Sequence, residues 1–329
     1  MELSNWWHFL GATVGHSRPS TPKFIDKDYP DLTGKVFLVS GGTSGVGFEV
    51  VKKLLGKNAK VWILGRSRAK LDALIADLKK TFPRSQLNCV VVDLSDLSTI
   101  KLGIQPLLNA ETRLHGIIHN AGVMNPPGGS KTKQGYELQL GTNDIGPFLL
   151  QKFLDHIIIA TAKQEPANEV RIIWVSSAGH FLSPSGGGIE WNDINFEHTK
   201  KSWTSIYGQS KAVDIYLSYM WAKKHPDSGV LSISCHPGLL RTELTRYHPV
   251  GRISSAGLKI ISPMYPAYFG AYTELFAALS PSLKTANSGS YVIPWGQMGS
   301  ARQDVKLGMT GENGERIWDW IDKQVTDYE

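Results

Sequence analysis

The chain has 329 residues, of which 41% are hydrophobic and 19% charged, as is ordinary for a globular protein with a substantial core. Its net charge of +6 suggests anionic partners, but the absence of any run of five or more Lys and Arg residues argues against a nucleic-acid groove. The two cysteines, Cys89 and Cys235, each stand in a strand-like run. We expect free thiols in a reducing compartment, namely the cytoplasm.

Metal-binding and membrane-spanning segments are not expected. The ten histidines show neither His-x-His nor His-Glu-x-x-His spacing, and Cys-x-x-Cys is absent. The apolar stretch 258–279 contains two prolines and two charged residues, so no transmembrane segment is predicted. The N-terminus has no secretory signal pattern. Its aromatic segment 5–10 is interpreted as a piece that packs on the fold, with contact to a membrane interface or a partner as the alternative.

From residue 35 onward, strand-like runs alternate with amphipathic helical segments such as 48–57 and 67–81. The strand-like runs are short, continuous and rich in Val and Ile: 36–39, 60–64, 88–92, 116–119, 171–175, 231–235 and 290–293. This alternation predicts an α/β protein with a three-layer doubly wound Rossmann fold and a mostly parallel seven-stranded sheet.

The domain organisation follows from the absence of any linker. We expect one Rossmann-type domain over 1–329, with an N-terminal extension (1–33), a cofactor-binding and catalytic core (34–242), a substrate lid region (239–271), and C-terminal helices with the last strand (272–329). A rigid helix pair that completes the core is the alternative to a lid.

A glycine-rich turn follows the first strand-like run. It reads Gly41-x-x-x-Gly45-x-Gly47, with Thr43, Ser44 and Val46 between the glycines. Glycines permit a tight turn and let the backbone approach a pyrophosphate, which then meets free amides at the start of a helix. The turn therefore predicts a dinucleotide site.

Residues at the ends of the next strands indicate which cofactor is bound. Arg66 stands where an acidic residue would mark NAD, and its guanidinium can pair with a 2′-phosphate, so NADP(H) is predicted. A solvated loop residue is the alternative for Arg66. Asp93, followed by Leu94, can meet the adenine amino group. The run Asn120-Ala121-Gly122 is small enough to lie against the cofactor.

Two further motifs complete the pattern: Ser176-Ser177 after the fifth run, and Tyr207-x-x-x-Lys211. Together with the glycine spacing they resemble the classical short-chain dehydrogenases/reductases, and the retinol-dehydrogenase-like branch in particular. The segments 135–137 and 140–150 resemble that branch around its catalytic Asn, which falls on Asn143. The run His236-Pro237-Gly238, with Thr242 shortly after, resembles the loop beside the nicotinamide. The segment 291–296 is similar to fungal members, so a carbonyl reductase of secondary metabolism is expected.

The chemistry gives each of these residues a role. Tyr207 supplies the proton to a carbonyl oxygen, and Lys211, one helical turn later, favours the tyrosinate through its charge. The resemblance assigns the carbonyl-binding hydroxyl to Ser177 rather than Ser176. Pro147 has no amide hydrogen, so the carbonyl of Asn143 is left free for a water leading toward Lys211. An ordinary proline kink is the alternative.

Departures from the family pattern are small polar changes at Ser40 and His119, and a longer loop beginning with 183–188 that alters the pocket wall. Candidate substrate residues lie in loops beyond the strand ends: Met124, His180, Phe181 and Leu239. A surface position is the alternative for His180. Core packing or an oligomer interface would account equally well for the apolar loop residues.

The sequence thus predicts an NADP(H)-dependent enzyme that interconverts an alcohol and a ketone or aldehyde on a lipophilic small molecule. A homo-oligomer is compatible with it. A cofactor-binding sensor or scaffold, and a non-redox isomerase or cyclase, remain the alternatives.

Overall fold

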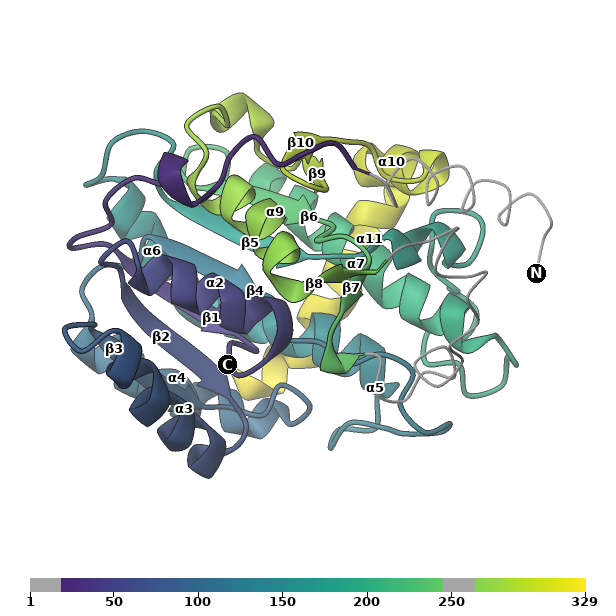
Figure 1. Ribbon diagram of the computed structural model, residues 1–329. Coiled ribbons are helices and arrows are strands. Elements are labelled where there is room, and N and C mark those ends of the chain that lie inside the picture. Colours follow the sequence, from purple (N-terminus) through teal and green to yellow (C-terminus); the bar gives the residue numbers. More distant parts are fainter. Residues whose placement is uncertain (1–18, 245–263) are drawn as a thin grey trace.

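The computed structural model describes residues 19–244 and 264–329. Their centre is a sheet in the order β10-β9-β6-β5-β4-β1-β2-β3, with helices on both faces (Figure 1). The strands are β1 (Val36–Ser40), β2 (Lys60–Gly65), β3 (Leu87–Val91), β4 (Gly116–His119), β5 (Arg171–Val175), β6 (Leu231–Cys235), β9 (Tyr291–Ile293) and β10 (Gln297–Met298). The doubly wound α/β fold predicted from the sequence is confirmed.

The sheet differs from the prediction in one strand. Every pairing from β3 to β9 is parallel, but β10 adds an eighth strand antiparallel to β9. This strand has only two residues, both exposed, so no run of buried apolar residues announces it in the sequence.

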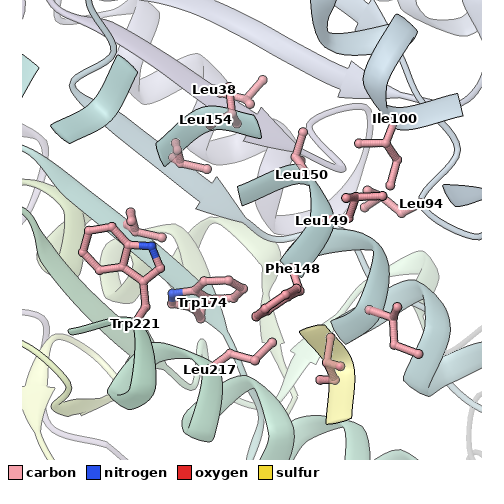
Figure 2. Close-up of a cluster of buried hydrophobic side chains, with 14 of the residues drawn as sticks. Leu38, Leu94, Ile100, Phe148, Leu149, Leu150, Leu154, Trp174, Leu217 and Trp221 are labelled. Carbon is pink, nitrogen blue, oxygen red and sulfur yellow. The ribbon is translucent and has the colours of Figure 1, made fainter. Parts of the chain in front are cut away.

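Two hydrophobic clusters cover the two faces of the sheet because successive strand residues point to opposite sides. One cluster takes Leu38 from β1 and packs it with α4 (Ile100–Ala110), α6 (Gly146–Ala162), α7 (Trp203–Lys224) and α11 (Glu312–Val325). Figure 2 shows its centre, where Trp174 of β5 lies among the leucines of α6 and the side chains of α7. The other cluster takes Val39 and packs it with α2 (Gly45–Leu55), α3 (Arg68–Thr81) and α9 (Ala267–Leu279).

The remaining elements are short. They are α5 (Leu138–Leu140), the edge pair β7 (Leu240–Arg241) and β8 (Tyr265–Pro266), and α10 (Gln303–Thr310). The aromatic segment 5–10 and most of the predicted lid region, 245–263, lie outside the described residues.

One helical stretch among the described residues, Leu138–Ala162, is long and apolar enough to cross a membrane by length and composition alone. In its most apolar window, 61% is buried inside the protein. Phe148, Leu149 and Leu154 of this stretch belong to the core over β5. Its apolar character is therefore explained by its position as a central helix of the fold.

Candidate active site

The predicted site residues gather at the carboxyl ends of the parallel strands, on both sides of the junction between β1 and β4. The chain leaves β1 toward β2 and returns to β4 on the opposite side of β1, so the direction of the strand order reverses at this junction. Ligands bind at this kind of position in doubly wound sheets.

The glycine turn after β1 is fitted closely to the loop after β4. Gly41 has a φ of 68°, and a Cβ added there would lie 2.8 Å from the Cα of Ala121. A Cβ on Gly47 would lie 2.4 Å from the side-chain nitrogen of Asn120. That nitrogen donates to the carbonyl of Ser40 at 3.0 Å. Side chains at either glycine position would therefore force the two loops apart.

The two departures from the family pattern have structural roles. The hydroxyl of Ser40 accepts a hydrogen bond from the Ala121 amide at 3.0 Å, so it joins the β1 and β4 loops. His119 is buried, pairs with Gln151 at 2.9 Å and stacks on Trp174 at 4.4 Å. Burial lowers the pKa of His119 to about 4, so its ring is neutral at physiological pH.

The start of α2 has backbone amides that no capping side chain satisfies. Ser44 precedes the helix, and its side chain makes no capping hydrogen bond. A Cβ on Gly45 would lie 3.4 Å from the Cβ of Thr242, and one on Gly270 would lie 3.0 Å from Val46. Thr242, predicted to lie beside the nicotinamide, is therefore next to Gly45 of the turn predicted to bind the pyrophosphate.

The other predicted cofactor residues lie along the same edge. Thr43 lies beside Gly65 at the end of β2, and Arg66 follows, exposed and without an ion pair or hydrogen bond to any described residue. Asp93 accepts hydrogen bonds from the amide and the hydroxyl of Ser95 at one of its carboxylate oxygens. Leu94 is buried, with its carbonyl against Gly146.

The predicted catalytic residues lie together between β5 and α7. Tyr207 is buried, and its ring lies so close to Gly179 that a Cβ there would stand 2.8 Å from the ring. The hydroxyl of Ser177 hydrogen-bonds to Tyr207 and accepts the Gly179 amide at 3.0 Å. Ser176 instead donates to the carbonyl of Lys211 at 2.6 Å. The structure therefore places Ser177, rather than its neighbour, beside Tyr207.

Asn143 lies near Lys211, and both side chains are close to Gly122. Its side-chain oxygen accepts the Val123 amide at 2.8 Å, and its nitrogen donates to the Ser210 hydroxyl at 3.0 Å. It stands in a π-helical turn, Gly141–Ile145, directly before α6. Wide turns of this kind are frequent at functional sites, and Pro147 follows within the first turn of α6. A Cβ on Gly122 would contact both the Asn143 side chain and the Lys211 ammonium nitrogen, at 3.2 and 3.8 Å.

The pKa of Tyr207 is not lowered overall, although the charge of Lys211 is expected to lower it. Burial raises the pKa of Tyr207, whereas Lys211 and the Ser177 hydrogen bond lower it, and two carboxylates, Asp214 and Asp144, raise it further. The net direction is upward. The sequence-based interpretation considered only the charges of the lysine and of the oxidised nicotinamide, because nothing in the pattern showed that Asp214 and Asp144 would be buried beside Lys211.

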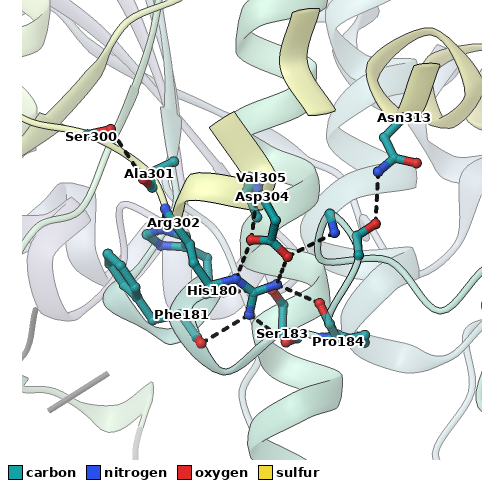
Figure 3. A network of polar contacts seen from close by, with 12 residues as sticks. His180, Phe181, Ser183, Pro184, Ser300, Ala301, Arg302, Asp304, Val305 and Asn313 are labelled. Carbon is teal, nitrogen blue, oxygen red and sulfur yellow. Dashed lines mark hydrogen bonds and ion pairs between the residues drawn. The ribbon is translucent and has the colours of Figure 1, made fainter. Parts of the chain in front are cut away.

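The loop after Ser177 is held by a residue from the C-terminal part of the chain. The guanidinium of Arg302 is buried and donates to the carbonyls of Phe181, Ser183 and Pro184, and it also pairs with Asp304 (Figure 3). Three carbonyls of one turn thus depend on one side chain. No motif in the sequence points to Arg302.

His180 belongs to the same network and does not lie on the surface. It is fully buried, its Nδ1 lies 2.6 Å from the Ser177 carbonyl, and its Nε2 accepts the Arg302 amide at 3.1 Å. These bonds place the proton on Nδ1. Both nitrogens are used within the protein, so its predicted contact with a substrate receives no geometric support.

A cluster of aromatic side chains packs against the loop that follows β6. Gly238 has a φ of 105°, and a Cβ there would lie 2.6 Å from the ring of Trp295. This ring packs against Tyr265 and Phe269 at centroid distances of 5.0 and 5.1 Å. The sequence singled out the segment around Trp295 only for its family likeness. The other predicted substrate residues, Met124, Phe181 and Leu239, are half-buried or buried in the loops around the site.

A metal centre is not indicated, since no group of three or more potential ligands lies together in the described parts of the chain.

The chain is similar in sequence to known proteins of one family. The family model for short chain dehydrogenase matches residues 35–186. A short-chain dehydrogenase/reductase of Emericella nidulans is 40% identical over 317 residues, which cover 95% of this chain and 98% of that protein. Another, from Neocamarosporium betae, is 37% identical over 319 residues, covering 93% of this chain and 91% of its own.

Solved structures show the same fold. An uncharacterized protein from Mycobacterium paratuberculosis superposes with a TM-score of 0.65 at 22% identity, covering 91% of this chain and 96% of that one. The NADPH-bound carbonyl reductase from chicken fatty liver superposes with a TM-score of 0.60 at 20% identity, covering 82% and 100%. At these identities the likeness concerns the fold alone.

Proposed function

This chain belongs to the short-chain dehydrogenase/reductase family, and on that premise we propose that it is an NADP(H)-dependent oxidoreductase. Its reaction interconverts an alcohol and a ketone or aldehyde on a lipophilic small molecule. The observation that carries the proposal is that the buried Tyr207 and Lys211 and the half-buried Ser177 lie together, with Gly122 of the loop after β4 close to Lys211.

The residues present fit a dinucleotide. Gly41 and Gly47 let the turn pack closely against the loop after β4, and the uncapped start of α2 offers amides to phosphate oxygens. Arg66 has its whole guanidinium available to a 2′-phosphate at the end of β2. An acidic residue at this place would favour NAD, and none is present.

The chain's own groups supply the proton chemistry. The bound nicotinamide supplies the hydride in reduction and accepts it in oxidation. Tyr207 donates its proton to the carbonyl oxygen, and its raised pKa keeps it protonated at neutral pH, as reduction requires. The Ser177 hydroxyl binds the same oxygen. Asn143 keeps the π-helical turn against α7, and Pro147 leaves the Asn143 carbonyl without its helical donor, so this carbonyl is able to accept a water.

The test is a measurement of cofactor consumption. The protein is incubated with NADPH and a panel of lipophilic ketones and aldehydes, and with NADP⁺ and the matching alcohols, while product is quantified by chromatography. We expect one cofactor oxidised per carbonyl reduced. Product without cofactor consumption would identify an isomerase or cyclase instead. Tight NADPH binding without turnover on any compound would identify a sensor or scaffold.

Cofactor choice gives a sharper prediction. Arg66→Ala should weaken NADPH binding by roughly 10- to 100-fold, because charge-assisted hydrogen bonds to the 2′-phosphate are lost, and should leave NADH binding nearly unchanged. Dissociation constants from fluorescence titration with both cofactors check this.

The matched control is Arg68→Ala, since Arg68 lies two positions later but is engaged with Asp72 and Cys89. Arg68→Ala should affect both cofactors little. Equal losses of NADPH and NADH affinity in Arg66→Ala would contradict a role in 2′-phosphate recognition.

We further propose that the protein acts in the cytoplasm. Cys89 and Cys235 are both free thiols, which suits a reducing compartment.

The cluster of aromatic rings formed by Trp295, Tyr265 and Phe269 supports an apolar substrate.

A further inference from the structure

The ammonium group of Lys211 has a buried carboxylate as a partner. Its nitrogen lies 2.8 Å from a side-chain oxygen of Asp214 and 3.0 Å from the carbonyl oxygen of Val175. The two side chains are only 7% and 2% exposed. Asp214 follows Lys211 by three residues, so both project from the same side of α7. Two of the three ammonium hydrogens are therefore committed to fixed acceptors.

A second acid, Asp144, shares this region. It directly follows Asn143 in the π-helical turn, is fully buried, and neither of its oxygens has a hydrogen-bond partner among the described residues. It is near enough to interact electrostatically with both Lys211 and Asp214. Two ionised carboxylates with one ammonium group would leave a net negative charge in a buried region. Burial and the neighbouring Asp214 raise the pKa of Asp144 strongly, so Asp144 holds its proton.

Among the described residues, Asp214 is the one carboxylate that hydrogen-bonds to Lys211. The ionisable groups that face the pair come from four elements: Tyr207 on α7, Glu137 and Asp144 ahead of α6, Cys235 on β6 and Tyr291 on β9. Burial raises the pKa of Cys235 and of Tyr291 well above their usual values, so both are neutral. Burial also raises the pKa of Glu137, and the backbone and side-chain hydrogen bonds of its own turn lower it.

We propose that Asp214 is the positioning residue of the catalytic lysine: it fixes the Lys211 ammonium at the end of β5 and keeps it charged, while Asp144 remains a neutral acid beside the pair. Burial by itself favours the neutral amine, and the Val175 carbonyl carries no charge to oppose this. Asp214 opposes it more strongly than Tyr207 and Asp144 do, and the pKa of Lys211 is raised overall, although burial works in the opposite direction.

The inference deepens the proposed function, because a permanently charged lysine matters for the acid–base chemistry of Tyr207. Its test is nevertheless independent of any substrate or cofactor. The Cε resonance of Lys211, identified by its disappearance in Lys211→Arg, is followed by carbon NMR while the pH of the free protein is raised.

The unmutated protein should keep Lys211 charged to the alkaline limit of the folded state. In Asp214→Asn, which has the same shape but no charge, the midpoint of Lys211 should fall by more than about one pH unit. Asp155→Asn is the control, since Asp155 lies on α6, bonded to Gln151 and Trp221, away from Lys211. A folded Asp214→Asn protein with an unshifted Lys211 midpoint would overturn the inference.

A second variant, Asp144→Asn, distinguishes the effect of Asp144 on the pKa of Lys211 from the effect of Asp214. Because Asp144 makes no hydrogen bond to Lys211 and raises its pKa less than Asp214 does, this variant should shift the Lys211 midpoint less than Asp214→Asn does. A shift as large as that expected for Asp214→Asn would show that Asp144 is the charged partner, and would also overturn the proposal.

A measurement on the unmutated protein covers the case in which Asp214→Asn does not fold. Burial raises the pKa of Asp214 to about 6 against the lowering effect of Lys211. The Lys211 resonance should therefore shift with a midpoint near that pH as its counter-charge is lost, and no such shift would count against the pair. A protein that reduces no carbonyl but shows the Lys211 response would overturn the proposed function and leave this inference intact.

Discussion

Tyr207→Phe is expected to lower kcat for carbonyl reduction by about a thousandfold, the contribution typical of a positioned general acid, with NADPH affinity largely unchanged. The variant removes only the hydroxyl that meets Ser177, and the phenyl ring retains the packing against Gly179. Steady-state rates with the best carbonyl of the panel, together with a fluorescence titration of NADPH, measure both quantities.

Tyr219→Phe is the matched control, because Tyr219 lies on the same helix, α7, but contacts Gly289 instead of the site. It should keep full activity. Turnover at the normal rate by Tyr207→Phe would remove this residue from the chemistry. A parallel loss of NADPH binding would mean that the variant damages the fold instead.

Glu274→Met should stabilise the protein by about 3 kcal/mol at pH 7, a large effect for one substitution. Glu274 lies in α9, is fully buried, and its carboxylate has no hydrogen-bond partner among the described residues. Burial raises its pKa from 4.5 to about 8. Methionine has a similar length and requires neither a proton nor a hydrogen bond.

The sign of the pH dependence of stability follows from the difference in proton binding to Glu274 between the folded and unfolded states. Between pH 4.5 and about 8 the folded protein holds a proton on Glu274 that the unfolded chain releases. Stability from this group is therefore complete below pH 4.5 and is lost as the pH rises toward 8. Urea unfolding at pH 5, 7 and 8.5 should show a gap between Glu274→Met and the unmutated protein that widens with pH.

The exposed Glu312, at the start of α11, provides the control, and Glu312→Gln should change stability by less than about 0.5 kcal/mol. A gap between Glu274→Met and the unmutated protein that does not depend on pH would mean that Glu274 is ionised in the folded state and has a partner.

Much of the fold could be predicted because its signals are local. The strands β1, β4 and β5 are continuous apolar runs buried on both faces, and such runs reveal a parallel sheet. The glycine turn, Tyr207 and Lys211 could be found in the same way, since each motif has a fixed spacing along the chain.

The features that escaped prediction depend on contacts between distant segments. Arg302 and Trp295 come from the C-terminal part, and nothing local shows that they reach the loops after Ser177 and Cys235. Asp214 and Asp144 read as ordinary polar residues of helices. Only the packing of α7 against the π-helical turn buries them with Lys211.

The position of Arg302 has a consequence for synthesis of the protein. A growing chain emerges from its N-terminus, so the glycine turn, Ser177 and Tyr207 leave the ribosome well before Arg302 does. Until then the carbonyls of Phe181, Ser183 and Pro184 lack the hydrogen bonds that this guanidinium donates. The glycine turn can therefore form early, whereas the segment from Phe181 to Pro184 completes its hydrogen bonds only after Arg302 has been synthesised.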